Sequence, residues 1–248
     1  MSLPRALVVR SGMNPFAALT ESPRIEIVEK SSHAIEPVAA APGAMDGAFD
    51  LAVLTSQIAV ERLAADPALL HAFRHATAGG RVAAVGAVTA EALERQGIPV
   101  AMTAAGSAEG VLDLLPRALD GWRVLLPCGE DASEELPEGL RYRGAHVVPV
   151  VVYRKVPRPH DAGLAREILE HPFAAFCTTS PSAARWLFES LPAAAADRLR
   201  ATPAVVLGRF TRRFLESHGV SRIETTEEQR FAAAVRLLEK LALAGAGA

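Results

Sequence analysis

Two stretches of the chain, FDLAVLTSQIAVERLAA (residues 49–65) and FAAFCTTSPSAARWLFE (residues 173–189), follow one pattern. Each opens with a short apolar segment typical of a buried strand, continues with Thr-Ser, and ends in an amphipathic helical segment. Thr55 and Ser56 therefore stand at the same place as Thr179 and Ser180, directly before a predicted helix. This repetition is the first indication that the chain contains two copies of one α/β module.

The repeat continues in RVAAVGAVTAEALERQGIPV (residues 81–100) and PAVVLGRFTRRFLESHGVSRI (residues 203–223). In both, a predicted strand ends at a glycine, a threonine follows three residues later, and a second glycine follows eleven residues after the first. The second glycine is typical of a helix C-terminus. The aligned residues are Gly86, Thr89 and Gly97 in the first copy and Gly208, Thr211 and Gly219 in the second.

Each copy is then predicted to add one more strand and one more helix. The apolar segments 98–102 and 220–225 predict the strands, and residues 107–119 and 226–241 predict the helices, each opened by a hydroxyl residue. An alternative is that any α/β chain offers such units by chance. The matched Gly, Thr, Gly spacing argues against that alternative.

Both copies still need two strands. The candidates are RALVV and RIEIVE near the start of the chain, and WRVLLP and HVVPVVVY in its middle. If the first pair joins the C-terminal copy, one lobe comprises residues 1–35 plus 158–248 and the other residues 40–150. Two extended, proline-containing linkers, residues 31–42 and 148–159, then join the lobes.

The predicted fold class is therefore α/β, with two flavodoxin-like or Rossmann-like parallel-sheet lobes joined by two extended linkers. The lobes are expected to be circular permutants of one five-stranded, doubly wound unit. A double linker restricts the lobes to hinge motion, which favours a cleft that closes on a ligand.

Composition excludes several classes of function. The chain has 248 residues, 50% of them hydrophobic, and a formal net charge of −2, so no broad basic surface for nucleic acid is expected. Cys128 and Cys177 form no metal-binding or disulfide spacing, which predicts no metal and a reducing cytoplasm. The sequence contains neither a signal-peptide pattern nor an apolar run of membrane-spanning length. We expect a soluble cytoplasmic monomer, since nothing indicates an extensive apolar interface.

The paired hydroxyl residues lie where a parallel sheet binds ligands, outside the carboxyl ends of its strands. Each helix start offers unpaired backbone N–H groups and the positive end of the helix dipole, which bind anions without a formal cation. Four such starts, two from each lobe, are expected to face one cleft and to suit a ligand with many carboxylates. The alternative for each residue is that it only caps its helix, and the two roles are compatible.

Three other interpretations are weaker. Neither GAVTAE nor GRFTRR forms the GxGxxG of dinucleotide-binding proteins. His71 and His75 stand four residues apart on a predicted helix, but no acidic partner matches a metalloprotease pattern, so they indicate a solvated helix face. Tyr153 ends the apolar strand HVVPVVVY and could donate a proton to a departing hydroxyl. It could equally close the strand end with its hydroxyl group in water.

The order and spacing of several motifs resemble the uroporphyrinogen-III synthase family along almost the whole chain. These motifs include DLAVLTS, VAAVGAVTAEALERQG, GSAEGVLDLL, WRVLLPCGED, GAHVVPVVVYR, TTSPSAARW and VVLGRFTRRFLESHG. The resemblance implies a lyase of tetrapyrrole and heme biosynthesis that needs no cofactor. Such an enzyme cyclises the linear tetrapyrrole hydroxymethylbilane to uroporphyrinogen III and inverts the terminal ring. The resemblance also points to the preceding enzyme of the pathway as a protein partner.

The resemblance assigns roles to individual residues. Tyr153 matches the tyrosine that assists departure of the hydroxyl. The positions implied to bind substrate carboxylates are Arg10, Thr55, Ser56, Gly86, Thr89, Ser107, Thr179, Ser180, Pro181, Gly208 and Thr211.

Three departures from the family pattern favour an alternative function. The segment TSQIAV, with Ile58, lacks the proline and the basic residue usual after Thr-Ser; Cys128 replaces a common arginine; and Arg209 precedes the threonine of LGRFT. The alternative is a catalytically weak or inactive, synthase-like module that binds tetrapyrrole or regulates a partner. A periplasmic solute receptor would share the bilobed shape but would require a signal peptide.

Overall fold

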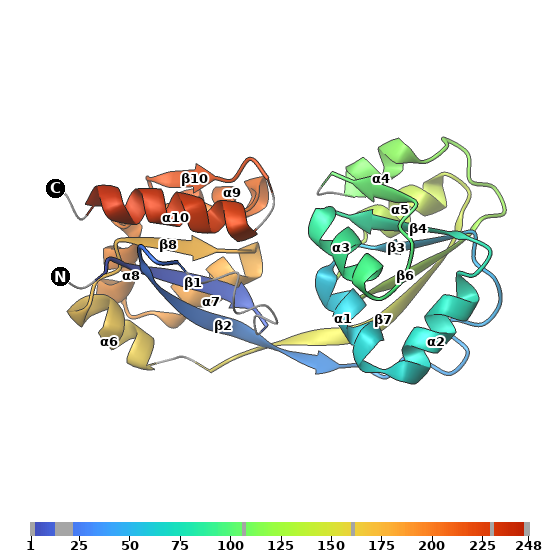
Figure 1. Cartoon of the computed structure of the whole chain (residues 1–248), viewed down its shortest axis with the longest axis horizontal. Coiled ribbons are helices and arrows are strands. Elements are labelled where there is room, and N and C mark those ends of the chain that lie inside the picture. The colour runs from blue at the N-terminus through green and yellow to red at the C-terminus, as the bar shows by residue number, and fades with distance from the viewer. Residues whose placement is uncertain (1–2, 13–21, 106–107, 160–161, 229–230, 246–248) are drawn as a thin grey trace. The chain divides into compact units, whose positions relative to one another are not determined.

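A computed structural model of the chain describes residues 3–12, 22–105, 108–159, 162–228 and 231–245 (Figure 1). The chain divides into two compact units. Unit 1 comprises Met1–Ile35 and Val156–Ala248, and unit 2 comprises Glu36–Lys155.

Unit 2 is a five-stranded parallel sheet in the order β7-β6-β3-β4-β5. Its strands are β3 (Leu51–Leu54), β4 (Arg81–Val85), β5 (Met102–Ala104), β6 (Arg123–Gly129) and β7 (His146–Pro157), the last of which continues into unit 1. Its helices are α1 (Gln57–Ala65), α2 (Pro67–Ala76), α3 (Ala87–Arg95), α4 (Ala108–Leu114) and α5 (Glu135–Tyr142).

Unit 1 is also a parallel sheet, in the order β10-β9-β8-β1-β2. Its strands are β1 (Arg5–Ser11), β2 (Glu26–Pro37), β8 (Ala175–Thr178), β9 (Ala204–Val206) and β10 (Ile223–Thr225), and β2 continues into unit 2. Its helices are α6 (Ala162–Glu170), α7 (Pro181–Ser190), α8 (Ala193–Arg200), α9 (Arg209–Ser217) and α10 (Phe231–Gly245).

The two strand orders are circular permutants of each other. If the strands of unit 1 are counted from β8, so that β1 and β2 come last, their order becomes 3-2-1-4-5, which is also the order of unit 2 counted from β3. The corresponding pairs are β3 with β8, β4 with β9, β5 with β10, β6 with β1, and β7 with β2. The predicted fold class, two doubly wound parallel-sheet modules, is confirmed.

Two strands pass from one unit to the other, and they neighbour each other in the strand order. β2 enters unit 2, where the Val38 N–H donates to the Val152 carbonyl at 3.1 Å. β7 enters unit 1, where the Arg158 N–H donates to the Ser32 carbonyl at 2.9 Å. Each of the two connections is thus held by at least one backbone hydrogen bond in the unit that it enters.

The sheet of unit 1 buries apolar side chains on both faces. Along β1, Leu7 and Val9 join a cluster with α7, α8 and α9, whereas Ala6 and Val8 join a second cluster with α10. This alternation is the period of a strand, and burial of both faces explains why RALVV contains a continuous apolar run. β8 divides in the same way, with Phe176 in the first cluster and Cys177 in the second.

Matching glycines end α3 and α9, as the repeat predicts. Gly97 and Gly219 have φ values of +68° and +84°, a left-handed conformation that favours glycine. The residue after each glycine, Ile98 or Val220, donates its N–H back to a leucine carbonyl of the helix, at 3.0 and 3.1 Å respectively. Both ends are therefore Schellman motifs with a buried apolar residue beyond the glycine.

This cap explains an error in the predicted strands. Ile98 and Val220 were expected to begin strands, but β5 begins only at Met102 and β10 at Ile223, because the apolar residue after each glycine packs onto its own helix. The helix predicted for residues 107–119 is also shorter, since α4 ends at Leu114, ahead of Pro116.

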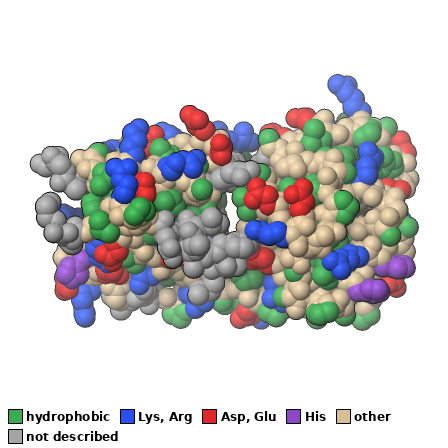
Figure 2. Space-filling model, in the orientation of Figure 1, with side chains coloured by type: hydrophobic (Ala, Val, Ile, Leu, Met, Phe, Trp, Pro, Cys, Tyr) green, Lys and Arg blue, Asp and Glu red, His purple; other side chains and the backbone are tan. Residues whose placement is uncertain are grey.

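Among the described residues, no helix is long and apolar enough to cross a membrane. On the face seen in Figure 2, Lys and Arg side chains are interspersed with Asp and Glu side chains over the described part of the chain.

Replacing Thr178 with valine is expected to raise the free energy of unfolding. Thr178 is fully buried in β8, and its hydroxyl lacks a hydrogen-bond partner among the described residues. A buried, unsatisfied hydroxyl costs about 1–3 kcal/mol, and valine has nearly the same shape. Urea unfolding should show a gain of about 1 kcal/mol for Thr178→Val.

The matched control is Thr202→Val, because the Thr202 hydroxyl donates to the Arg198 carbonyl at 2.9 Å. This variant should lose about 1 kcal/mol. A loss in both variants would show that the Thr178 hydroxyl is satisfied.

Candidate functional site

In unit 2, the carboxyl end of β3 leads into the start of α1. Ser56 is the N-cap of α1, and its Oγ accepts the Ala59 N–H at 3.2 Å. Thr55, the residue before it, is exposed. The Ser56 cap pairs one of the backbone N–H groups that lack a partner within the helix, and it leaves the other first-turn N–H groups at the positive end of the helix dipole.

Tyr153 lies on β7 beside this helix start. Its hydroxyl is 3.2 Å from Ser56 Oγ, and the residue is only 4% exposed. The ring packs on Gly129, where an added Cβ would lie 2.7 Å from Tyr153 Cζ. Tyr153 thus has a fixed position at the carboxyl end of the sheet, next to the two hydroxyl residues that the sequence predicts for the site.

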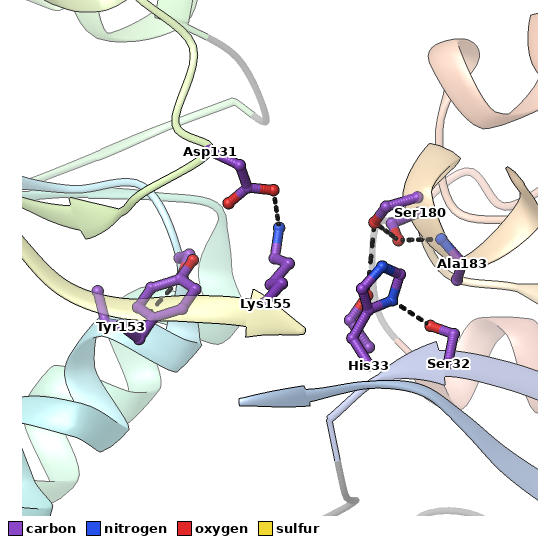
Figure 3. A network of polar contacts seen from close by, with 11 residues as sticks. Ser32, His33, Asp131, Tyr153, Lys155, Ser180 and Ala183 are labelled. Carbon is purple, nitrogen blue, oxygen red and sulfur yellow. Dashed lines mark hydrogen bonds and ion pairs between the residues drawn. The ribbon is translucent and has the colours of Figure 1, made fainter. Parts of the chain in front are cut away.

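These residues line a pocket of about 320 Å³ within unit 2. Its wall includes Thr55, Ser56, Cys128 and Tyr153. The sequence prediction omitted its charged residues, which are Asp131, Glu134, Glu135 and Lys155. Lys155 Nζ forms an ion pair with Asp131 at 3.0 Å, and Figure 3 shows Lys155 following Tyr153 on β7.

The acidic wall decides what the pocket can accept. The wall carries three carboxylates and one ammonium group, so it disfavours binding of an anionic group. Its carboxylates can accept hydrogen bonds from neutral donors. Burial, together with the nearby Glu134 and Asp131 carboxylates, raises the pKa of the Cys128 thiol above its ordinary value. The thiol is therefore protonated at neutral pH and is a poor nucleophile.

Unit 1 has a corresponding helix start at the carboxyl end of β8. Ser180 is the N-cap of α7 and accepts the Ala183 N–H at 3.2 Å, while Pro181 occupies the first helical position. The Thr179 N–H donates to the Val9 carbonyl at 3.1 Å. Ser182 Oγ lies 3.0 Å from Ser180 Oγ and 3.4 Å from Ser11 Oγ, so three hydroxyls gather here.

The Gly-x-x-Thr motifs are placed differently from the prediction. Gly86 and Gly208 are themselves the N-caps of α3 and α9, and the threonines lie in the first turns. Thr89 and Thr211 are only 4% and 3% exposed. The family resemblance implies that both threonines bind substrate carboxylates, but their side chains are buried, so the anion-binding groups at these two starts are backbone N–H groups.

The remaining predicted residues are dispersed. Arg10 is the last residue but one of β1, where its Nε lies 3.5 Å from Glu29 Oε1 and its guanidinium stacks over the Phe231 ring. Ser107 lies outside the described residues. Within the described ranges, no group of three or more His, Cys, Asp or Glu residues has a metal-binding arrangement.

A family model described as "Uroporphyrinogen-III synthase HemD" matches residues 13–236, which is most of the chain. The chain belongs to the uroporphyrinogen-III synthase family. The resemblance read from the sequence motifs is thereby confirmed.

Two relatives are similar to the chain over most of its length, and the name of the first agrees with this assignment. A Methanothermobacter thermautotrophicus protein named "Putative uroporphyrinogen-III synthase" is 31% identical over 188 residues, covering 71% of this chain and 72% of the relative. "Uncharacterized protein YjjA" of Bacillus subtilis is 27% identical over 191 residues, covering 73% and 69%.

Two solved structures share the fold. A mutant uroporphyrinogen III synthase of Thermus thermophilus has a TM-score of 0.64 at 24% identity, covering 96% of this chain and 99% of that one. The enzyme of Helicobacter pylori has a TM-score of 0.62 at 17% identity, covering 97% and 100%. At these identities the likeness shows the fold of a uroporphyrinogen-III synthase.

The structure describes two of the departures from the synthase pattern, and the correspondence between the units bears on the first. Cys128 on β6 corresponds to Arg10 on β1, because both residues precede the same register shift. One copy of the module thus keeps an arginine at this place. Arg209 and Phe210 begin α9, with the Arg209 guanidinium 4.9 Å above the Phe210 ring, which is 56% exposed.

Proposed function

We propose that this chain is a uroporphyrinogen-III synthase that cyclises hydroxymethylbilane to uroporphyrinogen III with inversion of the terminal ring. The observation that carries the proposal is the buried Tyr153 hydroxyl, 3.2 Å from the Ser56 hydroxyl, in the pocket at the start of α1. Membership of the family supports this reaction, and the Tyr153 hydroxyl in this pocket is the proton donor that we propose for its first step.

The first step is loss of the terminal hydroxyl of the substrate. The Tyr153 O–H protonates the departing oxygen, which leaves as water while the pyrrole nitrogen supplies the electron pair, giving an electrophilic azafulvenium cation and the Tyr153 phenolate. Ser56 Oγ already accepts the Ala59 N–H, so its own proton can be donated to the tyrosine oxygen as negative charge develops there.

The later steps return the proton. The terminal ring attacks through its substituted carbon to give a spiro intermediate, which fragments and recloses with that ring reversed. When the closing ring regains aromaticity it releases one proton, which restores the Tyr153 hydroxyl. Water is thereby the only other product.

The acidic wall of the pocket fits this assignment. The hydroxymethyl group is uncharged and pyrrole N–H groups are donors, so Asp131 can accept from them, whereas substrate carboxylates are disfavoured here. We propose that carboxylates instead bind at the other helix starts, to the backbone amides after Gly86, Ser180 and Gly208. Many weak contacts of this kind hold a flexible chain in one reactive shape.

Isomer analysis tests the proposal. Purified chain is incubated with enzymatically generated hydroxymethylbilane, and the type I and type III products are separated. Formation of type III isomer above the enzyme-free control supports a synthase. If only type I forms while the tetrapyrrole binds tightly, the chain is instead an inactive, tetrapyrrole-binding module. This is the alternative favoured by Cys128, which stands where the family commonly has an arginine.

Tyr153→Phe is expected to lower kcat by about tenfold to a hundredfold and to leave KM within about threefold. The loss is partial because positioning contributes much of the catalysis and survives the change. Isomer-resolved initial rates measure both constants. Tyr142→Phe is the matched control, since Tyr142 is 94% exposed. An unchanged kcat for Tyr153→Phe would remove Tyr153 from the mechanism.

A further inference from the structure

The two units share an irregularity at the end of corresponding strands. In β1 and β2, residues pair one to one from Arg5 with Glu26 to Arg10 with Ser31, and then Ser11 pairs with His33. In β6 and β7, pairing is regular as far as Cys128 with Val151, and then Gly129 pairs with Tyr153. Each second strand skips one residue at the same point, so His33 is the counterpart of Tyr153.

The backbone repeats this equivalence. The Gly12 N–H donates to the His33 carbonyl at 3.1 Å, and the Glu130 N–H donates to the Tyr153 carbonyl at 2.9 Å. A bulge re-aims the side chain that follows it, and bulges are common beside functional sites. The same bulge therefore presents Tyr153 in unit 2 and His33 in unit 1.

The residue that pairs with Tyr153 or His33 on the adjacent strand is matched in size to that side chain. In unit 2, Gly129 leaves room for the Tyr153 ring, which lies where a Cβ would stand. In unit 1 the corresponding residue is Ser11, which keeps its side chain and reaches Ser182 Oγ at 3.4 Å. The smaller imidazole of His33 leaves space for that serine.

His33 is a buried polar residue held in a defined orientation. It is 8% exposed, and its Nδ1 lies 2.8 Å from Oγ of the fully buried Ser32. Ser32 Oγ donates its only proton to the Arg10 carbonyl at 3.1 Å, so it must accept from Nδ1–H. Figure 3 shows the ring pointing toward the start of α7, where Ser180 lies.

We propose that His33 is a second substrate-contacting residue, in which Nδ1 is the structural atom and Nε2 binds a carboxylate of the tetrapyrrole. Nε2 would act beside the Ser11, Ser180 and Ser182 hydroxyls and the first-turn amides of α7. This inference rests on the proposed function for the identity of the ligand. A hydrogen bond from imidazolium to carboxylate is charge-assisted and stronger than a neutral one.

Two substitutions separate the roles of the two ring nitrogens. His33→Asn places an amide N–H near Nδ1 and preserves the bond to Ser32, but it removes Nε2. His33→Gln reaches the position of Nε2 and gives up the bond to Ser32. A residue with only a structural role is rescued by asparagine, whereas a substrate-contacting residue is rescued by glutamine.

The measurement is calorimetric binding of uroporphyrinogen III, under exclusion of oxygen, to the full-length chain. We expect His33→Asn to weaken binding about tenfold or more and His33→Gln to stay within about threefold of the unsubstituted chain. His71→Asn, on the exposed side of α2, is the control and should bind normally.

Normal binding by His33→Asn, or equal weakening by both variants, would overturn the proposal. So would an absence of binding by the unsubstituted chain. Because binding is measured without turnover, a chain that binds but forms no type III isomer refutes the synthase activity and leaves the role of His33 intact.

Discussion

Gly129→Ala is expected to lower the rate of uroporphyrinogen III formation at least about tenfold. An alanine Cβ would lie 2.7, 2.8 and 2.9 Å from Cζ, Cε2 and the hydroxyl oxygen of Tyr153. These separations are too short for non-bonded atoms, so the ring must move and lose its contact with Ser56. A misplacement of about 1 Å at a reacting group can cost roughly a hundredfold in rate.

Isomer-resolved kinetics measure this effect, and two further variants interpret it. Gly79→Ala is the control, because no atom lies within 4 Å of a Cβ at Gly79. In a Tyr153→Phe background, Gly129→Ala should cause much less additional loss, since both changes act on the same hydroxyl. Full additivity of the two losses would mean that Gly129 acts by another route.

Cys177 is expected to make the protein less stable at alkaline pH. Complete burial raises the pKa of its thiol from 9.0 to about 12, with Arg10 opposing part of the rise. Between these two values the unfolded chain has lost the thiol proton and the folded chain retains it. The stabilisation is therefore complete below pH 9 and is lost as the pH rises toward 12.

Urea unfolding at about pH 7.5 and pH 10.5 tests this for the unsubstituted chain and Cys177→Ala. A pH about 1.5 units above the unfolded pKa corresponds to a loss of about 2 kcal/mol from this thiol alone. The alanine variant starts less stable because of the cavity, but its loss between the two pH values should be smaller by that amount. All other titrating groups, including Cys128, are present in both proteins, so equal losses would rule out the assignment to Cys177.

Features encoded by neighbouring residues could be predicted from the sequence. The Ser56 and Ser180 caps and the glycines that end α3 and α9 depend on a few adjacent residues, and their local chemistry specifies them. The strand starts were misplaced because an apolar residue such as Ile98 suits a strand and a helix cap equally. Only packing decides between the two.

The candidate site was less predictable because its members come from distant parts of the chain. Ser11 and Ser182 approach each other across 171 positions, and no local pattern relates them. Lys155 could have been proposed, since it follows Tyr153 by two residues and alternate residues share a face of a strand. The register shift that equates His33 with Tyr153 is visible only once the strands are paired.

The discontinuity of unit 1 has a consequence for synthesis on the ribosome. Unit 2 is continuous, so all its strands have emerged by the end of β7, whereas unit 1 lacks β8 until Thr178 has been translated and β10 until Thr225 has been translated. Until Thr178 has been translated, β1, which is apolar on both faces and central in its sheet, has no β8 beside it. The nascent chain must therefore protect its first strand from aggregation while more than half of the protein is still being made.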